Sequence, residues 1–367
     1  MSAAFSVLCR PREPPQADLP YLCARIWART RDLLPNESLE RFRGLSQLSD
    51  LFHALLETPC ASALKQSVLD TNDLDELETG LTAVYAGRVA EVRRLVEQSV
   101  PEYLYLIVGE WDMHHVRALV RWVLCRWDAE AVRQAFLPVG TFTRERYDQA
   151  MAADTLPDLF RRLEAWLPEL TAELRSFAER PQKEEMALWP WELFLDELHF
   201  RRMLRCAQHA RNRADAEIIR RCTTLRIDLA NLRTSLRLLG RRLAADEVQS
   251  LYLSGGSIPW KSFAAMMRAD AIEQIHRRLP RGPLTAALDL GLLSLVNTGW
   301  PAVFERLFDE QRIRLKKTLA RGYPVSVAVP LYFMARAYNE LVNLRTIARG
   351  IRYRIPAGKV RENLVYA

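Results

Sequence analysis

The residues best suited to charge chemistry are an acid, an amide or imidazole, and two arginines, which recur together three times with identical spacing. The three sets are Asp112, His115, Arg117 and Arg121; Asp228, Asn231, Arg233 and Arg237; and Glu340, Asn343, Arg345 and Arg349. Carboxylates and guanidinium groups form strong, charge-assisted hydrogen bonds. These sets therefore suit ion pairing and anchoring between packed helices.

Within each set, the acid and the first arginine cannot pair with each other if the segment is a helix. Five positions along a helix correspond to directions about 140° apart. We therefore expect partners elsewhere: three equivalent helices would surround a pseudo-threefold axis, where the acid of one copy meets an arginine of the next or both line a central opening. The alternative is that these charges are solvated flanks of core helices.

Other patterns of chemical interest are weaker. His114 and His115 are neighbours that face different directions on a helix, and asparagine replaces His115 in the other copies, so no metal site is expected. Ser254-Gly255-Gly256-Ser257 lacks the spacing of a phosphate-binding loop and is interpreted as a turn. No nucleophile elbow is present. The sequence predicts a protein that is not an enzyme and binds no cofactor.

The elements that position these residues are predicted to be helices. Upstream of each set, apolar residues recur at helical spacing and a proline follows, which indicates a helix that ends and a second helix that begins. The segments are 48–55, 156–163 and 272–279, followed by Pro59, Pro168 and Pro280. No sustained alternation typical of strands appears. The predicted fold is therefore all-α.

The repeat divides the chain. A period of about 110 to 118 residues is too long for a solenoid module, so each copy is expected to be a small helical lobe. Glycine turns separate the copies. We predict a loose N-terminal lead-in over residues 1–20 and helical units over 21–138, 139–256 and 257–367.

Composition limits the class of protein. Lysine and arginine total 52 against 45 acidic residues, a net charge of +7, which suits an acidic partner or an anionic membrane surface. The six cysteines form no CxxC pair and no signal peptide is apparent, which favours the cytoplasm. The longest apolar runs, 284–296 and 324–335, fall short of the roughly 20 residues of a membrane helix. Any membrane association is expected to be peripheral.

The third unit carries a resemblance to a known family. Its residues are Pro330-Leu331-Tyr332, then Asn339-Glu340-Leu-Val-Asn343-Leu344-Arg345-Thr-Ile347, Ile355-Pro356 and Arg361-Glu362-Asn363-Leu364. These segments, the triple motif and the chain length resemble the family that comprises the C subunits of V-type and archaeal A-type ATPases and the d subunits of vacuolar ATPases. The resemblance spans the whole chain. It departs from the family pattern at His115, where asparagine is usual, and at Cys60, where tyrosine is frequent.

The resemblance implies an all-helical protein of three similar lobes arranged as a funnel. It implies a non-catalytic coupling subunit on the cytoplasmic face of the membrane. Such a subunit sits on the proteolipid ring, receives the foot of the central stalk and transmits torque for ion transport coupled to ATP hydrolysis or synthesis. The implied partners are the proteolipid ring and the central-stalk rotor subunits, with the stator protein of the membrane sector as a further candidate. The chain would act as a monomer within that larger complex, and no nucleic acid is implied.

Two other functions stay open at the level of sequence. A basic helical protein could bind nucleic acid through the pairs Arg201-Arg202, Arg220-Arg221 and Arg241-Arg242. The cluster around Trp189-Pro190-Trp191 could stack bases, although such aromatic residues more often fasten helices together. A helical scaffold with another partner is the other alternative. Salt-dependent binding of DNA or RNA would identify the first function, and neighbouring genes for ATPase subunits would argue against the second.

Overall fold

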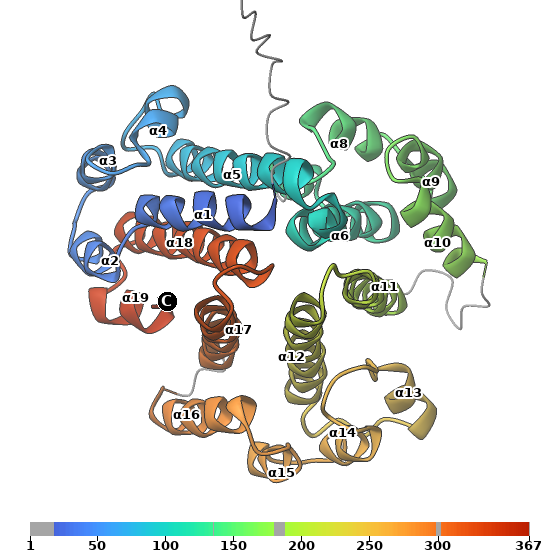
Figure 1. Ribbon diagram of the computed structural model, residues 1–367. Coiled ribbons are helices and arrows are strands. Elements are labelled where there is room, and N and C mark those ends of the chain that lie inside the picture. The colour runs from blue at the N-terminus through green and yellow to red at the C-terminus, as the bar shows by residue number, and fades with distance from the viewer. Residues whose placement is uncertain (1–17, 135, 180–187, 299–301, 367) are drawn as a thin grey trace, which may run out of the picture.

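The protein is a helical body in the computed structural model, which describes residues 18–134, 136–179, 188–298 and 302–366 (Figure 1). All regular elements in these ranges are helices, which confirms the predicted all-α class. The predicted lead-in lies outside the described residues up to residue 17. Helix α1 (Leu19–Arg29) begins two residues before the expected start at Tyr21, because the Asp18 carboxylate accepts a hydrogen bond from the Tyr21 amide at 3.0 Å and caps the helix.

Groups of short helices alternate with pairs of long ones along the chain. After α1 come a 3₁₀ turn (Thr30–Asp32), α2 (Asn36–Arg43), α3 (Leu48–Leu56), α4 (Ala61–Ser67), α5 (Leu74–Ser99) and a second 3₁₀ turn (Pro101–Tyr103). The next group is α6 (Leu104–Cys125), α7 (Ala129–Gln134), α8 (Arg144–Met151), α9 (Leu156–Glu164), α10 (Pro168–Ala178) and α11 (Leu188–Gln208). Then follow α12 (Arg213–Arg237), α13 (Ala245–Ser250), α14 (Trp260–Met266), α15 (Ile272–His276), α16 (Pro283–Thr298) and α17 (Ala302–Gly322). The chain ends with α18 (Ala328–Arg352) and α19 (Ala357–Asn363).

The short helices form where the sequence predicts helix pairs. The apolar segments became α3, α9 and α15, and each contacts the helix that follows it. In α9, the Thr155 hydroxyl caps the first turn by accepting from the Asp158 amide at 3.3 Å, and the face with Leu159 and Leu163 is buried. Pro168 is the first residue of α10, a position where proline needs no amide partner.

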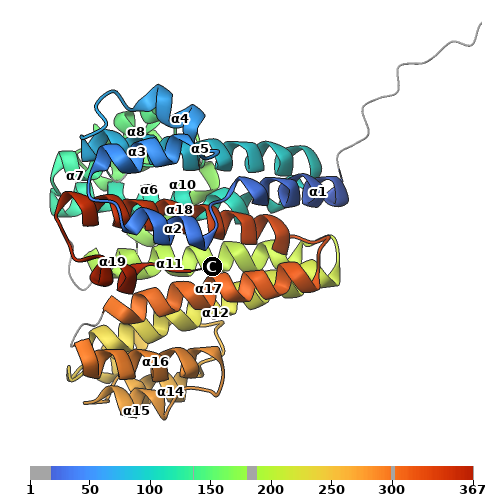
Figure 2. The ribbon, with the colours of Figure 1, turned by 90° about the vertical axis from the view of Figure 1, so that its left-hand side faces the viewer.

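The long helices follow one another around the middle of the molecule. In order they are α5, α6, α11, α12, α17 and α18, and each contacts the next, with α18 contacting α5 to close the ring. Figure 1 shows this ring, with α1 drawn between α5 and α18 and the other short helices around the outside. In the view turned by 90°, the long helices run side by side across the molecule (Figure 2). The three helices that carry the recurring motif, α6, α12 and α18, all belong to the ring.

The hydrophobic cores reveal how the ring is held together. The motif part of α6 packs with the apolar residues of α8 to α11, and the motif part of α12 packs with those of α14 to α17. The motif part of α18 packs with α1 to α5, at the other end of the chain. Each motif helix is therefore part of the core built by the next predicted unit, and the third unit supplies its motif helix to the first.

None of the described helices combines the length and the apolar character needed to cross a membrane.

Candidate functional site

The motif acids of α6 and α12 anchor the loops that begin the next predicted unit. Asp112 accepts hydrogen bonds from the Thr141 amide at 2.7 Å and the Thr141 hydroxyl at 2.9 Å. Asp228 accepts from the Ser257 hydroxyl at 2.6 Å and the Ile258 amide at 3.0 Å. Burial raises the pKa of both carboxyls, while these donors oppose the rise.

The glycine turns predicted at the unit joints lie directly against these acids. A methyl group added at Gly140 or at Gly256 would overlap the carboxylate of Asp112 or Asp228, respectively. Gly140 also has a positive φ of +82°, which other residues rarely adopt. The segment Ser254 to Ser257 is thus a turn that closes over an acid, in agreement with the prediction of a turn there.

The third acid closes the ring. Glu340 on α18 is buried, accepts from the Leu34 amide at 2.6 Å and forms an ion pair with Arg88 of α5 at 2.6 Å. Both partners belong to the first predicted unit. Glu340 therefore joins the C-terminal motif helix to the N-terminal part of the chain.

The amide or imidazole of each motif holds a backbone segment 22 residues further along the chain. Asn231 donates to the Leu253 carbonyl at 2.8 Å and accepts from the Leu253 amide at 3.0 Å. Asn343 holds Val365 with the same two bonds and the same distances. Among the described contacts, His115 accepts a single hydrogen bond, from the Leu137 amide at 3.2 Å. Burial lowers the pKa of His115 to about 3, so its ring is neutral. The three residues hold equivalent segments in the three copies.

The motif arginines point to the other flank and pair with acids of a neighbouring long helix. Their partners come from α11, α17 and α5 for the first, second and third copies. The pairs are Arg117 with Asp196, Arg121 with Glu192 at 2.7 Å, Arg233 with Glu305 at 2.7 Å, Arg237 with Glu305 at 3.5 Å, Arg345 with Glu78 at 3.7 Å and Arg349 with Glu78 at 2.6 Å.

The sequence hypothesis offered two arrangements, acids paired with arginines of the next copy or both kinds of residue lining a central opening, and the structure answers each separately. No motif acid pairs with a motif arginine among the described contacts: Asp112 and Asp228 hold loops, and the partner of Glu340 is Arg88, which lies outside the motif. Two motif arginines, Arg117 and Arg233, do line a central cavity, whereas the three acids do not.

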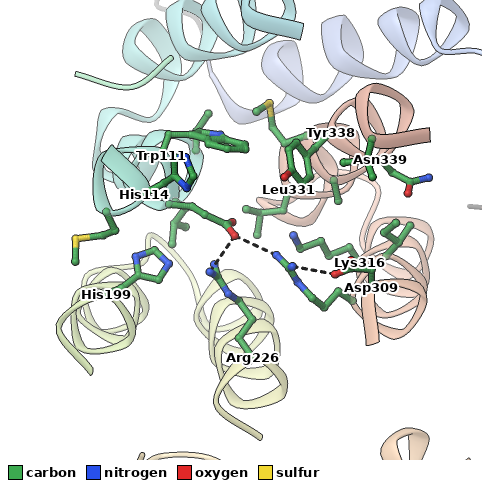
Figure 3. Close-up of a pocket in the computed structure, with 18 of the residues that line it drawn as sticks. Trp111, His114, His199, Arg226, Asp309, Lys316, Leu331, Tyr338 and Asn339 are labelled. Atoms are coloured by element: carbon green, nitrogen blue, oxygen red, sulfur yellow. Dashed lines mark hydrogen bonds and ion pairs between the residues drawn. The ribbon is translucent and has the colours of Figure 1, made fainter. Parts of the chain in front are cut away.

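This central cavity has a volume of about 350 Å³ and is formed by residues of α5, α6, α11, α12, α17 and α18 and of the C-terminal segment. A charged cluster occupies its walls (Figure 3). Glu110 pairs with Arg226 at 3.1 Å and with Arg312 at 3.2 Å, and Arg312 also pairs with Asp309 at 3.2 Å. Lys316 lines the same space.

The cavity environment shifts the pKa values of these groups. Burial opposes ionisation of Glu110, but the guanidinium groups of Arg226 and Arg312 outweigh it and lower the pKa of this carboxyl. Burial, reinforced by Arg312, lowers the pKa of Lys316 to about 8. Burial also lowers the pKa of His199 well below its ordinary value, so His199 is neutral. The cluster is therefore a set of fixed charges with one readily titrated amine.

This cluster was not predicted from the sequence, although three of the cavity residues occupy one equivalent position in the three motif helices. Glu110, Arg226 and Tyr338 each lie two residues before the motif acid of their own helix, and all three face the cavity. The three copies carry an acid, a base and a tyrosine at this position, so a search for residues that recur does not find it.

The aromatic cluster around Trp189-Pro190-Trp191 lies at the start of α11, where Trp191 belongs to the core that contains the first motif helix and Trp189 is half-exposed. Trp191 is buried and its ring contacts Phe177 edge-on at a centroid distance of 4.7 Å. Within the described residues, no three His, Cys, Asp or Glu side chains come together in a way that could hold a metal ion.

Comparison with known proteins decides the family. The model of the family described as ATP synthase (C/AC39) subunit matches residues 22–363. The chain belongs to this family. Among its relatives is the C subunit of the A-type ATP synthase of Thermococcus onnurineus, which is 23% identical over 93% of this chain and 92% of its own length. The C subunit of the V-type ATP synthase of Thermus thermophilus is 26% identical over 95% and 98%, and that of the A-type enzyme of Pyrococcus abyssi is 22% identical over 93% and 89%.

The family match covers all three motif helices and every cavity-lining residue except Val365. Membership supports a role in an A-type or V-type ATP synthase and agrees with the resemblance carried by the residues of the third motif.

Proposed function

We propose that the chain is the non-catalytic coupling subunit of a rotary A/V-type ATPase, a socket that joins the membrane proteolipid ring to the central rotor shaft. It would transmit torque for ion transport coupled to ATP hydrolysis or synthesis. Its partners would be the proteolipid ring and the central-stalk rotor subunits, with the stator protein of the membrane sector as a further candidate. It would work as a monomer of that complex, peripheral to the membrane at its cytoplasmic face.

The observation that carries this proposal is the closed ring of long helices in a chain of this family. A torque-transmitting part must not dissipate rotation as internal strain, and densely packed helices resist deformation. The contact of α18 with α5 and the buried ion pair of Glu340 with Arg88 make the ring continuous from one end of the described chain to the other. We infer that the units 21–138, 139–256 and 257–367 act together as one pseudo-threefold, funnel-like collar.

The distribution of charge favours this role over nucleic-acid binding. Arg201 and Arg202 both pair with Glu173, at 2.5 and 3.3 Å. Arg242 pairs with Asp270 at 2.9 Å. Arg201 and Arg202 share the single carboxylate of Glu173 with Arg205. Basic residues that already pair with an acid gain less from phosphate contacts than unpaired ones.

Co-purification tests the proposal. A tagged copy of the chain should be isolated from detergent-solubilised membranes together with proteolipid and central-stalk subunits. Depleting the chain should leave ATP hydrolysis by the catalytic sector measurable while ATP-driven ion transport into membrane vesicles is lost, and adding the chain back should restore transport. Transport that persists without the chain, or isolation of the chain with nucleic acid in place of rotary subunits, would refute the proposal.

A further inference from the structure

The central cavity holds more positive charge than its acids neutralise. Arg117 pairs with Asp196, and Arg233 pairs with Glu305, which Arg237 also contacts from outside the cavity. The remaining charges are those of Arg226, Arg312 and Lys316 against those of Glu110 and Asp309. One positive charge is therefore left over in a space with partly apolar walls, where charge is costly without a counter-ion.

Hydrogen-bond donors without acceptors face the same space. Lys316 makes no hydrogen bond or ion pair in the described part of the chain, and Figure 3 shows its amine directed toward the middle of the cavity. The Nε of Arg312 and the Nε2 of His199 are buried and have no partner among the described atoms. His199 Nδ1 lies 2.9 Å from the Tyr105 hydroxyl. When that hydroxyl donates to Nδ1, Nε2 carries the proton and becomes a third free donor.

We propose that this cavity binds one small tetrahedral oxyanion, such as inorganic phosphate, between Lys316 on α17 and Arg226 and Arg312 on opposite walls. An oxyanion has several acceptor oxygens and can bridge donors that come from different helices. Guanidinium groups match its geometry, and an ammonium group adds a point charge. A volume of about 350 Å³ accommodates such an ion together with water. The proposal does not depend on the role of the chain in a rotary complex.

Titration calorimetry of the full chain with inorganic phosphate at pH 7 and constant ionic strength, with chloride as background salt, tests the site. We expect one phosphate per chain and at least about tenfold weaker binding by the Lys316→Met variant, because a charge-assisted bond is lost. Lys261→Met is the matched control, since Lys261 is exposed and outside the cavity, and it should bind phosphate as the unchanged chain does.

Sulfate provides a second readout, because its charge does not change between pH 7 and pH 9.5. The charged and titratable groups that line the cavity with Lys316 or act on its charge are Glu110 from α6, His199 from α11, Cys222 and Arg226 from α12, Asp309 and Arg312 from α17 and Tyr338 from α18. Burial raises the pKa of Cys222 and of Tyr338, so both side chains stay neutral to a higher pH than usual. Sulfate binding should therefore weaken several-fold as Lys316 loses its proton, and this dependence should vanish in Lys316→Met.

Three results would overturn the proposal. One is phosphate or sulfate binding that is equally tight in Lys316→Met. Another is a stoichiometry well above one ion per chain, and the third is an equal loss of affinity in Lys261→Met. The variant is expected to fold, because methionine fills the space of the lysine side chain without its charge.

Discussion

Replacing Asn231 with alanine tests how strongly the motif holds the next segment of the chain. Asn231 is fully buried, and its amide satisfies both backbone groups of the buried Leu253. Alanine would leave that N–H and that carbonyl without partners. Each buried group left unsatisfied costs about 1–3 kcal/mol, so we expect the segment around Leu253 to lose roughly 2–6 kcal/mol of stability.

The third copy provides graded companions to this variant. Both Asn343 and Asn339 donate to the Val365 carbonyl at 2.8 Å, but only Asn343 accepts from the Val365 amide. Asn343→Ala leaves one backbone group unsatisfied, which costs about 1–3 kcal/mol, and Asn339→Ala leaves none, which costs under about 1 kcal/mol. The expected order of destabilisation is Asn231→Ala, then Asn343→Ala, then Asn339→Ala.

Hydrogen exchange of individual amides is the appropriate assay, because a body of several lobes need not unfold in one step. A loss of roughly 2–6 kcal/mol corresponds to exchange faster by about 30-fold to 20,000-fold at Leu253, since each 1.4 kcal/mol is a factor of ten. The Val365 amide is the internal control for Asn231→Ala, and the Leu253 amide is the control for the third-copy variants. Unchanged exchange at Leu253, or the largest effect in Asn339→Ala, would refute the reasoning.

Further predictions concern the joint and the cavity. Gly256→Ala should lower the free energy of opening of its surrounding segment by about 1–3 kcal/mol, measured by hydrogen exchange, because its methyl group would overlap Asp228. Gly87→Ala should instead raise the free energy of opening of its own segment by about 0.5–1 kcal/mol, since nothing lies within 4 Å of a methyl group there and the residue is inside helix α5. Burial lowers the pKa of Lys316 to about 8 from an ordinary 10.5, so the unfolded chain binds this proton more tightly than the folded chain. Lys316→Met should therefore be more stable than the unchanged chain at pH 7, by on the order of 1–3 kcal/mol, and the difference should shrink as pH rises from 8 toward 10.5.

The fold class and the helix pairs could be predicted because their signals are local. Apolar residues at helical spacing and the prolines that follow them led to α3, α9 and α15. The closure of the ring could not be predicted in the same way. The contacts of Glu340 with Leu34 and Arg88 span 306 and 252 residues, and one of the two is made to a backbone amide that has no side-chain pattern.

The candidate site was predictable only where the three copies agree. The motif residues recur, and the structure places them at equivalent contacts in the ring. The cavity cluster depends on positions where the copies differ, Glu110, Arg226 and Tyr338, together with Arg312 and Lys316 of α17. If the three copies had identical side chains at the position of Glu110, Arg226 and Tyr338, the central cavity would hold either three like charges or no charge from that position. Divergence at a position shared by the copies is therefore itself a signal of an asymmetric interior.

The two flanks of each motif helix have separate structural roles, which explains why acids and arginines do not meet. On one flank, the acid and the amide hold backbone that lies 22 to 30 residues further along the chain in the first two copies. On the other flank, the arginines pair with a long helix of the unit that packs around them, such as Glu305 of α17 beside Arg233. The separation of about 140° between the acid and the first arginine allows one helix to bind both neighbours at once.

Glu340 and Arg349 of α18 bind the first unit from these same two flanks, so the ring of helices is closed. Opening the ring at any joint would break the hydrogen bonds between an acid, amide or imidazole and the backbone groups that it satisfies, and this cost resists twisting at all three joints.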